Sequence, residues 1–179
     1  LVTGATRGIG YETVRQLAQA GVHTLLAGRD RGRAVEAALK LQSEGLPVEA
    51  IVLDVTDAAS IAAAVGEVAK KFGRLDILVN NAGIMIDESG KKISEQSAQT
   101  WRNTFDTNVF GLIDTTNAFL PLLHESPAGR IVNVSSGGGQ LSEMGTWAPA
   151  YCISKTALNA VTCALAAALK PDNIAVNSV

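Results

Sequence analysis

The chain has 179 residues, of which 47% are hydrophobic and 18% are charged, and its formal net charge is −2. This composition is ordinary for a globular domain with a sizeable core, and no basic stripe indicates a nucleic-acid partner. No apolar run approaches the ~20 residues of a membrane span, and we see no secretory signal pattern. If Cys152 and Cys163 share one helix, they lie ~16 Å apart, too far for a disulfide, which favours reduced thiols and a cytoplasmic protein.

Short apolar runs alternate with longer helical patterns along the chain. We predict strands at 1–3, 23–28, 48–54, 75–80, 130–136 and 174–179, and helices at 9–20, 30–44, 57–72, 98–124 and 149–170. Asp30 and Asp57 stand where helix N-caps belong. The strands lack polar alternation, which is typical of parallel strands buried on both faces. The sequence therefore predicts an α/β fold over residues 1–179, a doubly wound parallel sheet between two helix layers.

The first predicted strand runs directly into the glycine-rich stretch TGATRGIG, residues 3–10. Gly4, Gly8 and Gly10 permit close approach of a ligand to the backbone, and the helix that follows points its N-terminal amides at that ligand. A glycine-rich turn without a ligand is the alternative. The strand before the loop and the helix after it favour binding of a dinucleotide pyrophosphate.

The end of the second strand predicts which dinucleotide binds. An NAD site usually has an acidic residue there, which holds the ribose 2′-hydroxyl. Gly28 and Arg29 occupy this place, and Arg7 lies in the glycine loop. A glycine leaves room for a 2′-phosphate, and arginine binds phosphate through two parallel hydrogen bonds. We therefore expect NADP(H) in preference to NAD(H), with solvated surface arginines as the alternative.

Five motifs together resemble the short-chain dehydrogenase/reductase family, in the Rossmann-fold form with a TGxxxGxG loop. They are TGATRGIG at 3–10, LDV at 53–55, NNAG at 80–83, TNVFG at 107–111 and VNVSS at 132–136, followed by YCISK at 151–155. The resemblance implies that the cofactor is bound by Gly4, Thr6, Arg7, Gly8, Ile9, Gly10, Arg29, Asp54, Val55, Asn81, Ala82, Gly83, Tyr151 and Lys155. It covers the whole chain and also implies a C-terminal substrate-binding segment and a last strand, which we expect the chain to lack.

The resemblance implies that Asn108, Ser136, Tyr151 and Lys155 are catalytic. Tyr151 and Lys155 are one helical turn apart and share a face. A phenol ordinarily has a pKa of ~10, and a neighbouring ammonium lowers it, which makes a general acid for a carbonyl oxygen. In the family, the serine closing the fifth motif binds the substrate oxygen, and the asparagine holds a relay water beside the lysine. We prefer Ser136 over Ser135 because the second serine matches and strand alternation separates the two side chains.

The sequence thus predicts an oxidoreductase that transfers a hydride between NADP(H) and a carbonyl or alcohol, and no metal site. The alternatives are a non-catalytic dinucleotide-binding sensor on the same fold and a sugar-nucleotide epimerase or dehydratase. Met144 and Trp147 suggest an apolar small-molecule substrate, although simple loop packing explains them equally well. The helices 98–124 and 149–170 form the usual dimer surface in the family, so we expect a homodimer or homotetramer.

Overall fold

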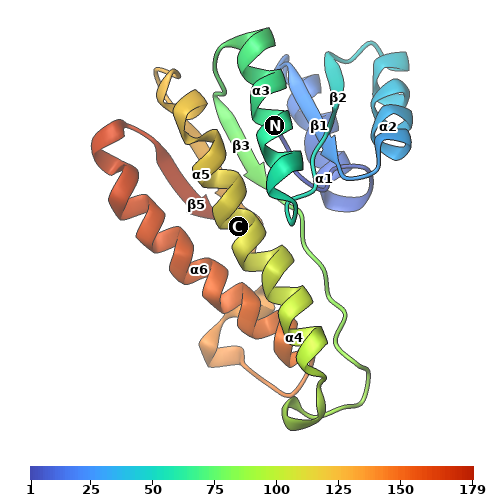
Figure 1. Cartoon of the computed structure of the whole chain (residues 1–179), viewed down its shortest axis with the longest axis vertical. Coiled ribbons are helices and arrows are strands. Elements are labelled where there is room, and N and C mark those ends of the chain that lie inside the picture. The colour runs from blue at the N-terminus through green and yellow to red at the C-terminus, as the bar shows by residue number, and fades with distance from the viewer.

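The computed structural model describes residues 1–179 and shows a parallel sheet between two layers of helices (Figure 1). The strands are Thr24–Gly28 (β1), Val48–Val52 (β2), Ile77–Asn80 (β3), Arg130–Asn133 (β4) and Ala175–Ser178 (β5). The helices are Gly8–Gln19 (α1), Arg31–Ser43 (α2), Ala58–Phe72 (α3), Ala98–Phe105 (α4), Gly111–His124 (α5) and Pro149–Leu169 (α6). The predicted α/β architecture is confirmed.

The sheet is parallel throughout, with β1 beside β2 and with β3, β4 and β5 side by side. Val2 bridges Leu26 on one side and Val79 on the other, which joins both groups of strands. The predicted first strand, 1–3, is reduced to this bridge because the chain turns into the glycine loop at once. The spatial order is therefore β2, β1, Val2, β3, β4, β5.

Three predicted elements differ from the structure where the chain approaches the candidate site. The strands predicted at 48–54 and 130–136 are shorter in the structure and end at Val52 and Asn133. The helix predicted at 98–124 is interrupted by a π-helical turn, Asp106–Phe110. The two predicted caps are correct: Asp30 accepts from the Arg33 amide at 2.8 Å, and Asp57 accepts from the Ala59 amide at 2.9 Å.

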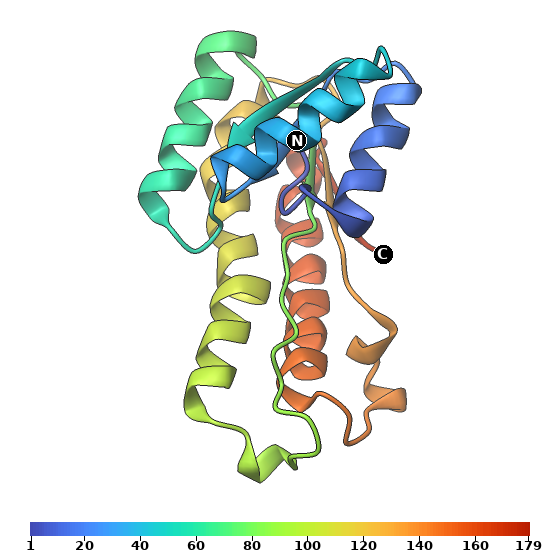
Figure 2. The same cartoon turned by 90° about the vertical axis from the view of Figure 1, so that its right-hand side faces the viewer.

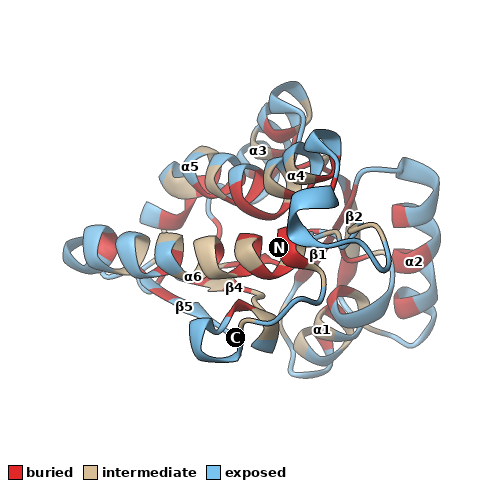
Figure 3. Ribbon diagram, turned by 90° about the horizontal axis from the view of Figure 1, so that it is seen from below, coloured by how far each residue is buried: buried red, intermediate tan, exposed pale blue.

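The core lies in two apolar clusters, and Figure 3 shows the buried positions of the helices turned inward. A network of hydrogen-bonded, buried polar side chains runs through the core. Asn80 donates to Asn133 at 2.9 Å and to Thr116 at 3.0 Å, and Asn133 donates to Thr162 at 2.9 Å. Buried amides of this kind need such partners. This network connects β3 and β4 to α5 and α6, so the segments after both strands leave the sheet side by side.

Helices α4, α5 and α6 extend well past the carboxyl ends of the strands, and the segment after β3 runs down beside them (Figures 1 and 2). Contrary to the expectation from the sequence, one stretch has the length and apolar composition of a membrane span: Pro149–Asp172, which contains α6 and is 33% buried over its most apolar 18 residues. That test is also passed by core helices of globular proteins. Here α6 packs against β5 and α4.

Candidate active site

The glycine loop and the segment after β3 form one hydrogen-bonded unit. Thr3 Oγ1 accepts from the amides of Asn81 and Ala82, each at 3.0 Å. Asn81 Nδ2 donates to the carbonyls of Thr3 at 2.8 Å and Gly4 at 3.2 Å. A Cβ on Gly10 would overlap Asn81 Nδ2 and lie 2.9 Å from Ala5 Cα. Gly10 therefore allows the start of α1 to sit directly against Asn81.

The N-terminus of α1 is open to an anion. Its N-cap, Arg7, is extended and makes no side-chain cap hydrogen bond. Gly8 has a φ of +61°, and a Cβ there would meet nothing within 4 Å, so the backbone beside these amides is bare. Uncapped amides at the positive end of a helix dipole suit a pyrophosphate. The predicted loop residues Gly4, Arg7, Gly8 and Ile9 are exposed around this N-terminus.

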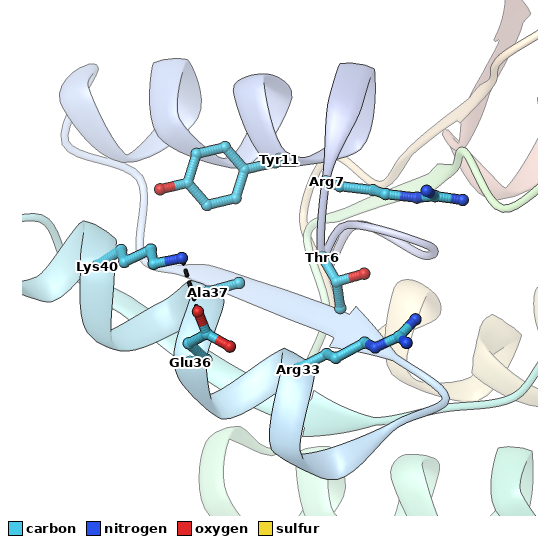
Figure 4. Close-up of a pocket in the computed structure, with 7 residues that line it drawn as sticks. All are labelled: Thr6, Arg7, Tyr11, Arg33, Glu36, Ala37 and Lys40. Carbon is cyan, nitrogen blue, oxygen red and sulfur yellow. Dashed lines mark hydrogen bonds and ion pairs between the residues drawn. The ribbon is translucent and has the colours of Figure 1, made fainter.

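A cleft of about 600 Å³ lies between α1 and α2, beside the glycine loop. It is lined by Thr6, Arg7, Tyr11, Arg33, Glu36, Ala37 and Lys40, and Glu36 pairs with Lys40 at 2.7 Å (Figure 4). The side chains of Arg7 and Arg33 extend toward the same side of the cleft.

Two features of this cleft add to the sequence-based expectations, and the predicted role of Arg29 in holding the cofactor stays a prediction. Arg29 is exposed and does not line it, whereas Arg33 does. The cap at Asp30 was the signal for Arg33, because it places residue 33 in the first turn of α2. In addition, a Cβ on Gly28 would overlap the Thr6 methyl group. Gly28 therefore makes room for Thr6, and its place beside a ligand 2′-phosphate stays a prediction.

Asp54 and Val55 follow β2 at the same end of the sheet. Asp54 Oδ1 accepts from the Thr56 amide at 2.9 Å and from its hydroxyl at 2.8 Å. Val55 is buried against Gly111, whose hypothetical Cβ would lie 2.9 Å from it. These contacts fix the segment, and its role in holding the adenine stays a prediction.

Asn108 lies in the π turn and is 1% exposed, and both polar atoms of its side chain are hydrogen-bonded. Its Oδ1 accepts from the Ile84 amide at 2.7 Å, and its Nδ2 donates to the Ile84 carbonyl at 2.9 Å. Nδ2 also donates at 3.0 Å to Ser154 Oγ, which in turn donates to the Tyr151 carbonyl at 2.6 Å. The side chain thus joins the segment after β3 to the helix that carries Tyr151. Ser154 was missed in the sequence, although it lies within the YCISK motif.

Lys155 is buried, and its Nζ donates to the Val134 carbonyl at 2.7 Å. Nζ lies 5.7 Å from the centroid of the Tyr151 ring. A Cβ built on Gly83 would lie 3.5 Å from Lys155 Nζ and 3.4 Å from Asn108 Oδ1. Burial lowers the pKa of Lys155 to about 8, because the ammonium loses water. The structure therefore brings Asn108 and Lys155 together around Gly83, with the Tyr151 ring beside Lys155.

Ser136 follows β4 and meets the start of α6 across Gly138. Ser136 Oγ accepts from the Gly138 amide at 3.1 Å, which leaves its hydroxyl proton available to a ligand. A Cβ on Gly138 would lie 3.5 Å from Ser136 Oγ and 3.0 Å from Cys152 Sγ. Ser135 Oγ is instead buried. The two serines thus differ in surroundings, but both lie past the end of β4, so strand alternation does not separate them, and the choice of Ser136 stays a prediction.

A second cavity, of about 480 Å³, opens between the segment after β3 and the loop before α6. Met85, Asp87, Trp147 and Ala148 are among its lining residues. The Trp147 ring stands edge-on to Tyr151, with centroids 6.2 Å apart. Of the two apolar residues predicted to face a substrate, Trp147 lines this cavity and Met144 does not. Met85, from the segment after β3, also lines this cavity, which the sequence did not indicate.

A family model described as short chain dehydrogenase matches residues 1–179. An uncharacterized oxidoreductase of Staphylococcus saprophyticus is 34% identical over 181 residues, which cover 100% of this chain and 75% of the relative. Among solved structures, the fold is similar to a gluconate 5-dehydrogenase from Burkholderia cenocepacia in complex with NADP and tartrate, with a TM-score of 0.89 and 30% identity over 98% of this chain and 67% of that one.

A variant of actinorhodin polyketide ketoreductase with NADPH superposes with a TM-score of 0.90 and 31% identity, covering 99% of this chain and 67% of that one. The family match spans the glycine loop, the π-turn asparagine and the tyrosine and lysine of α6, which the geometry groups at one end of the sheet. The chain therefore belongs to the short-chain dehydrogenase/reductase family, whose members are oxidoreductases.

Proposed function

We propose that this protein is an NADP(H)-dependent oxidoreductase that reduces a ketone or aldehyde, reversibly, to the alcohol. The observation that carries this proposal is the placement of Asn108 and Lys155 around Gly83, with the Tyr151 ring beside Lys155 and Ser136 across Gly138. The glycine loop is hydrogen-bonded to the same segment through Asn81. A dinucleotide on the loop would therefore lie beside these four side chains.

In this proposal, bound NADPH supplies the hydride that the carbonyl carbon accepts. Ser136 donates its hydroxyl proton in a hydrogen bond to the substrate oxygen and holds that oxygen near Tyr151. Tyr151 transfers its phenolic proton to the same oxygen as negative charge develops there. The hydride and this proton together convert the carbonyl to an alcohol.

Lys155 supports the proton transfer. With a pKa of about 8, its ammonium exchanges protons near neutral pH more readily than an ordinary lysine. It lies close enough to the Tyr151 ring to favour a developing phenolate. Asn108 fixes the Ile84 backbone beside it and, by resemblance, holds the relay water.

The preference for NADP(H) rests on Arg7 and Arg33, which line the cleft beside the glycine loop. Neither guanidinium has an acidic partner within ion-pair distance, so both are available to a 2′-phosphate. Two structurally similar proteins were solved with NADP and NADPH. For the substrate, the Trp147 ring stands beside Tyr151 and offers one apolar contact, in a cavity whose other lining residues are mostly polar.

The test is NADPH oxidation by the full-length gene product over a panel of aldehydes, ketones and quinones. We expect turnover that falls by about a hundredfold or more in Tyr151→Phe, because the general acid is lost. NADPH binding, followed by its fluorescence, should persist in that variant. Tight NADPH binding without turnover on any carbonyl would support the non-catalytic sensor instead.

To test the cofactor preference, the same measurement is repeated with NADH in place of NADPH and with the Arg33→Ala variant. We expect the parent to favour NADPH and Arg33→Ala to lose about tenfold in its affinity for NADPH but little for NADH, because a charge-assisted pair to phosphate contributes about 1.5–3 kcal/mol. Arg130→Ala, at the start of β4 and so at the opposite end of the sheet from the glycine loop, is the matched control. Equal use of both cofactors by the parent would contradict the NADP(H) preference.

A further inference from the structure

The N-terminus of α6 lacks a cap from its own segment. Its N-cap residue, Ala148, has a left-handed backbone with a φ of 43° and no side chain that can accept a hydrogen bond. Pro149 follows and carries no amide proton. The first intrahelical bond runs from the Cys152 amide to the Ala148 carbonyl at 2.9 Å. The amides of Ala150 and Tyr151 therefore need acceptors from elsewhere in the chain.

Asp87 supplies both acceptors from a distant part of the sequence. Its Oδ1 accepts from the Ala150 amide at 2.7 Å, and its Oδ2 accepts from the Tyr151 amide at 3.1 Å. The two oxygens of one carboxylate thus span consecutive amides at the positive end of the helix dipole, where an anion is favoured. One of these two amides belongs to the proposed general acid itself.

The surroundings of Asp87 connect this contact to the site. Asp87 closes the short segment that begins at Ile84, whose backbone is held by Asn108. Figure 2 shows the segment after β3 descending beside α6 toward the N-terminal end of that helix. The segment is thus attached to α6 at two levels: through Asn108 and Ser154, and at the first turn through Asp87.

Asp87 also borders the second cavity, together with Met85 and Trp147. Trp147 precedes the left-handed Ala148, so the direction of its ring depends on how the chain enters α6. A carboxylate that fixes the first turn of α6 therefore fixes both the Tyr151 backbone and the wall formed by Trp147.

We propose that Asp87 is a positioning residue for the reaction, which holds Tyr151 and the entrance of α6 in the geometry that proton transfer requires. This proposal rests on the proposed carbonyl reduction. Misplacement of a reacting group by about 1 Å can cost on the order of a hundredfold in rate. An ordinary helix cap would instead contribute about 0.5–2 kcal/mol of stability with no effect on turnover.

The experiment compares Asp87→Asn and Asp87→Ala with Asp57→Ala in the full-length protein. Asp57 caps α3 through the Ala59 amide, outside the proposed catalytic and binding residues, and so matches the loss of an aspartate cap. For each variant, the midpoint of thermal unfolding, the Kd for NADPH, and kcat and KM for a carbonyl substrate are measured well below the lowest midpoint. Hydrogen exchange reports on the amides of Ala150 and Tyr151.

In Asp87→Ala we expect kcat to fall by about tenfold or more, with the Kd for NADPH within about twofold of the parent. Asp87→Asn keeps one acceptor oxygen and should fall in between, and it remains informative if the alanine variant does not fold. Both variants should lose protection at Ala150 and Tyr151. Asp57→Ala should lose similar stability and keep its kcat.

A folded Asp87→Ala protein with the parent's kcat, or with Ala150 and Tyr151 still protected, would overturn the positioning role and leave the proposed function intact. A parent protein without any carbonyl turnover would instead overturn the proposed function, and the role of Asp87 with it. A loss of kcat in Asp57→Ala as large as in Asp87→Ala would also overturn the proposal, because general destabilisation would then explain both.

Discussion

Lys155 shows how a single buried residue links the stability of this protein to its chemistry. Its ammonium is removed from water and donates to one backbone carbonyl, that of Val134. No acidic side chain offsets the cost of burial, and the pKa of Lys155 falls to about 8 from an ordinary value of 10.5. The same desolvation that makes proton exchange possible near neutral pH therefore destabilises the folded chain.

The sign of the resulting pH dependence follows from the lowered pKa. Below pH 8 the lysine is charged in both states, and the folded state bears the full cost of burying it. Between pH 8 and 10.5 the unfolded chain binds the proton more strongly, so this contribution to stability improves as the pH rises. From pH 7 to 9.5 we expect the free energy of unfolding to rise by about 2 kcal/mol relative to Lys155→Met.

Urea unfolding of the cofactor-free protein at several pH values would measure this difference, with Lys155→Met as the reference without the titrating group. Parallel stability curves for the two proteins would show that the buried ammonium keeps its ordinary pKa.

At the scale of elements, the glycine loop and the segment after β3 act as one unit. Gly10→Ala would place a methyl group against Asn81 Nδ2 and the Ala5 backbone, and Asn81 would have to release the carbonyls of Thr3 and Gly4. Overpacking of this kind costs about 1–3 kcal/mol. We expect that loss in chemical denaturation, together with weaker NADPH binding.

Gly66→Ala is the matched control, because a Cβ there meets nothing within 4 Å and the residue lies inside α3. It should be neutral or slightly stabilising, since alanine favours a helix. A Gly10→Ala protein as stable as the parent would mean that the loop can separate from Asn81 without cost.

Most of the element order and the candidate site could be predicted from the sequence, because each depends on local pattern. Apolar runs, cap residues such as Asp30, and the spacing of Tyr151 and Lys155 are short-range signals. What could not be predicted depends on contacts between distant segments. Asp87 reaches α6 across 63 positions, and the overlap of Thr6 with Gly28 requires the loop and β1 to be folded together. Neither of these two contacts produces a recognisable pattern in the local sequence.

At the scale of the whole molecule, α6 carries a row of small residues that are exposed to solvent. Ala160, Ala164 and Ala167 are exposed at helical spacing, and Cys163 lies between them. An apolar stripe of this kind on a long helix favours association. We therefore predict that the protein forms a dimer or tetramer in which this face of α6 is buried.

Sedimentation of the full-length protein would measure the assembly. Ala164→Glu should shift it toward monomer, because a buried charge without a partner is costly. Ala63→Glu, at an exposed position of α3, should leave the assembly unchanged. A monomeric parent protein, or an unchanged assembly in Ala164→Glu, would contradict the prediction.

Because of the π turn between α4 and α5, the number of residues from Ala98 to His124 matters for the fold as much as their identity. Thr100, Thr104, Asn108 and Leu112 are buried at steps of four. In a regular helix each such step overshoots a full turn by about 40°, so the last would face about 120° away from the first. The wide turn absorbs this rotation. Substitutions at the exposed Asp106 or Phe110 should be tolerated, whereas deleting one residue here would force either Asn108 or the apolar face of α5 into solvent.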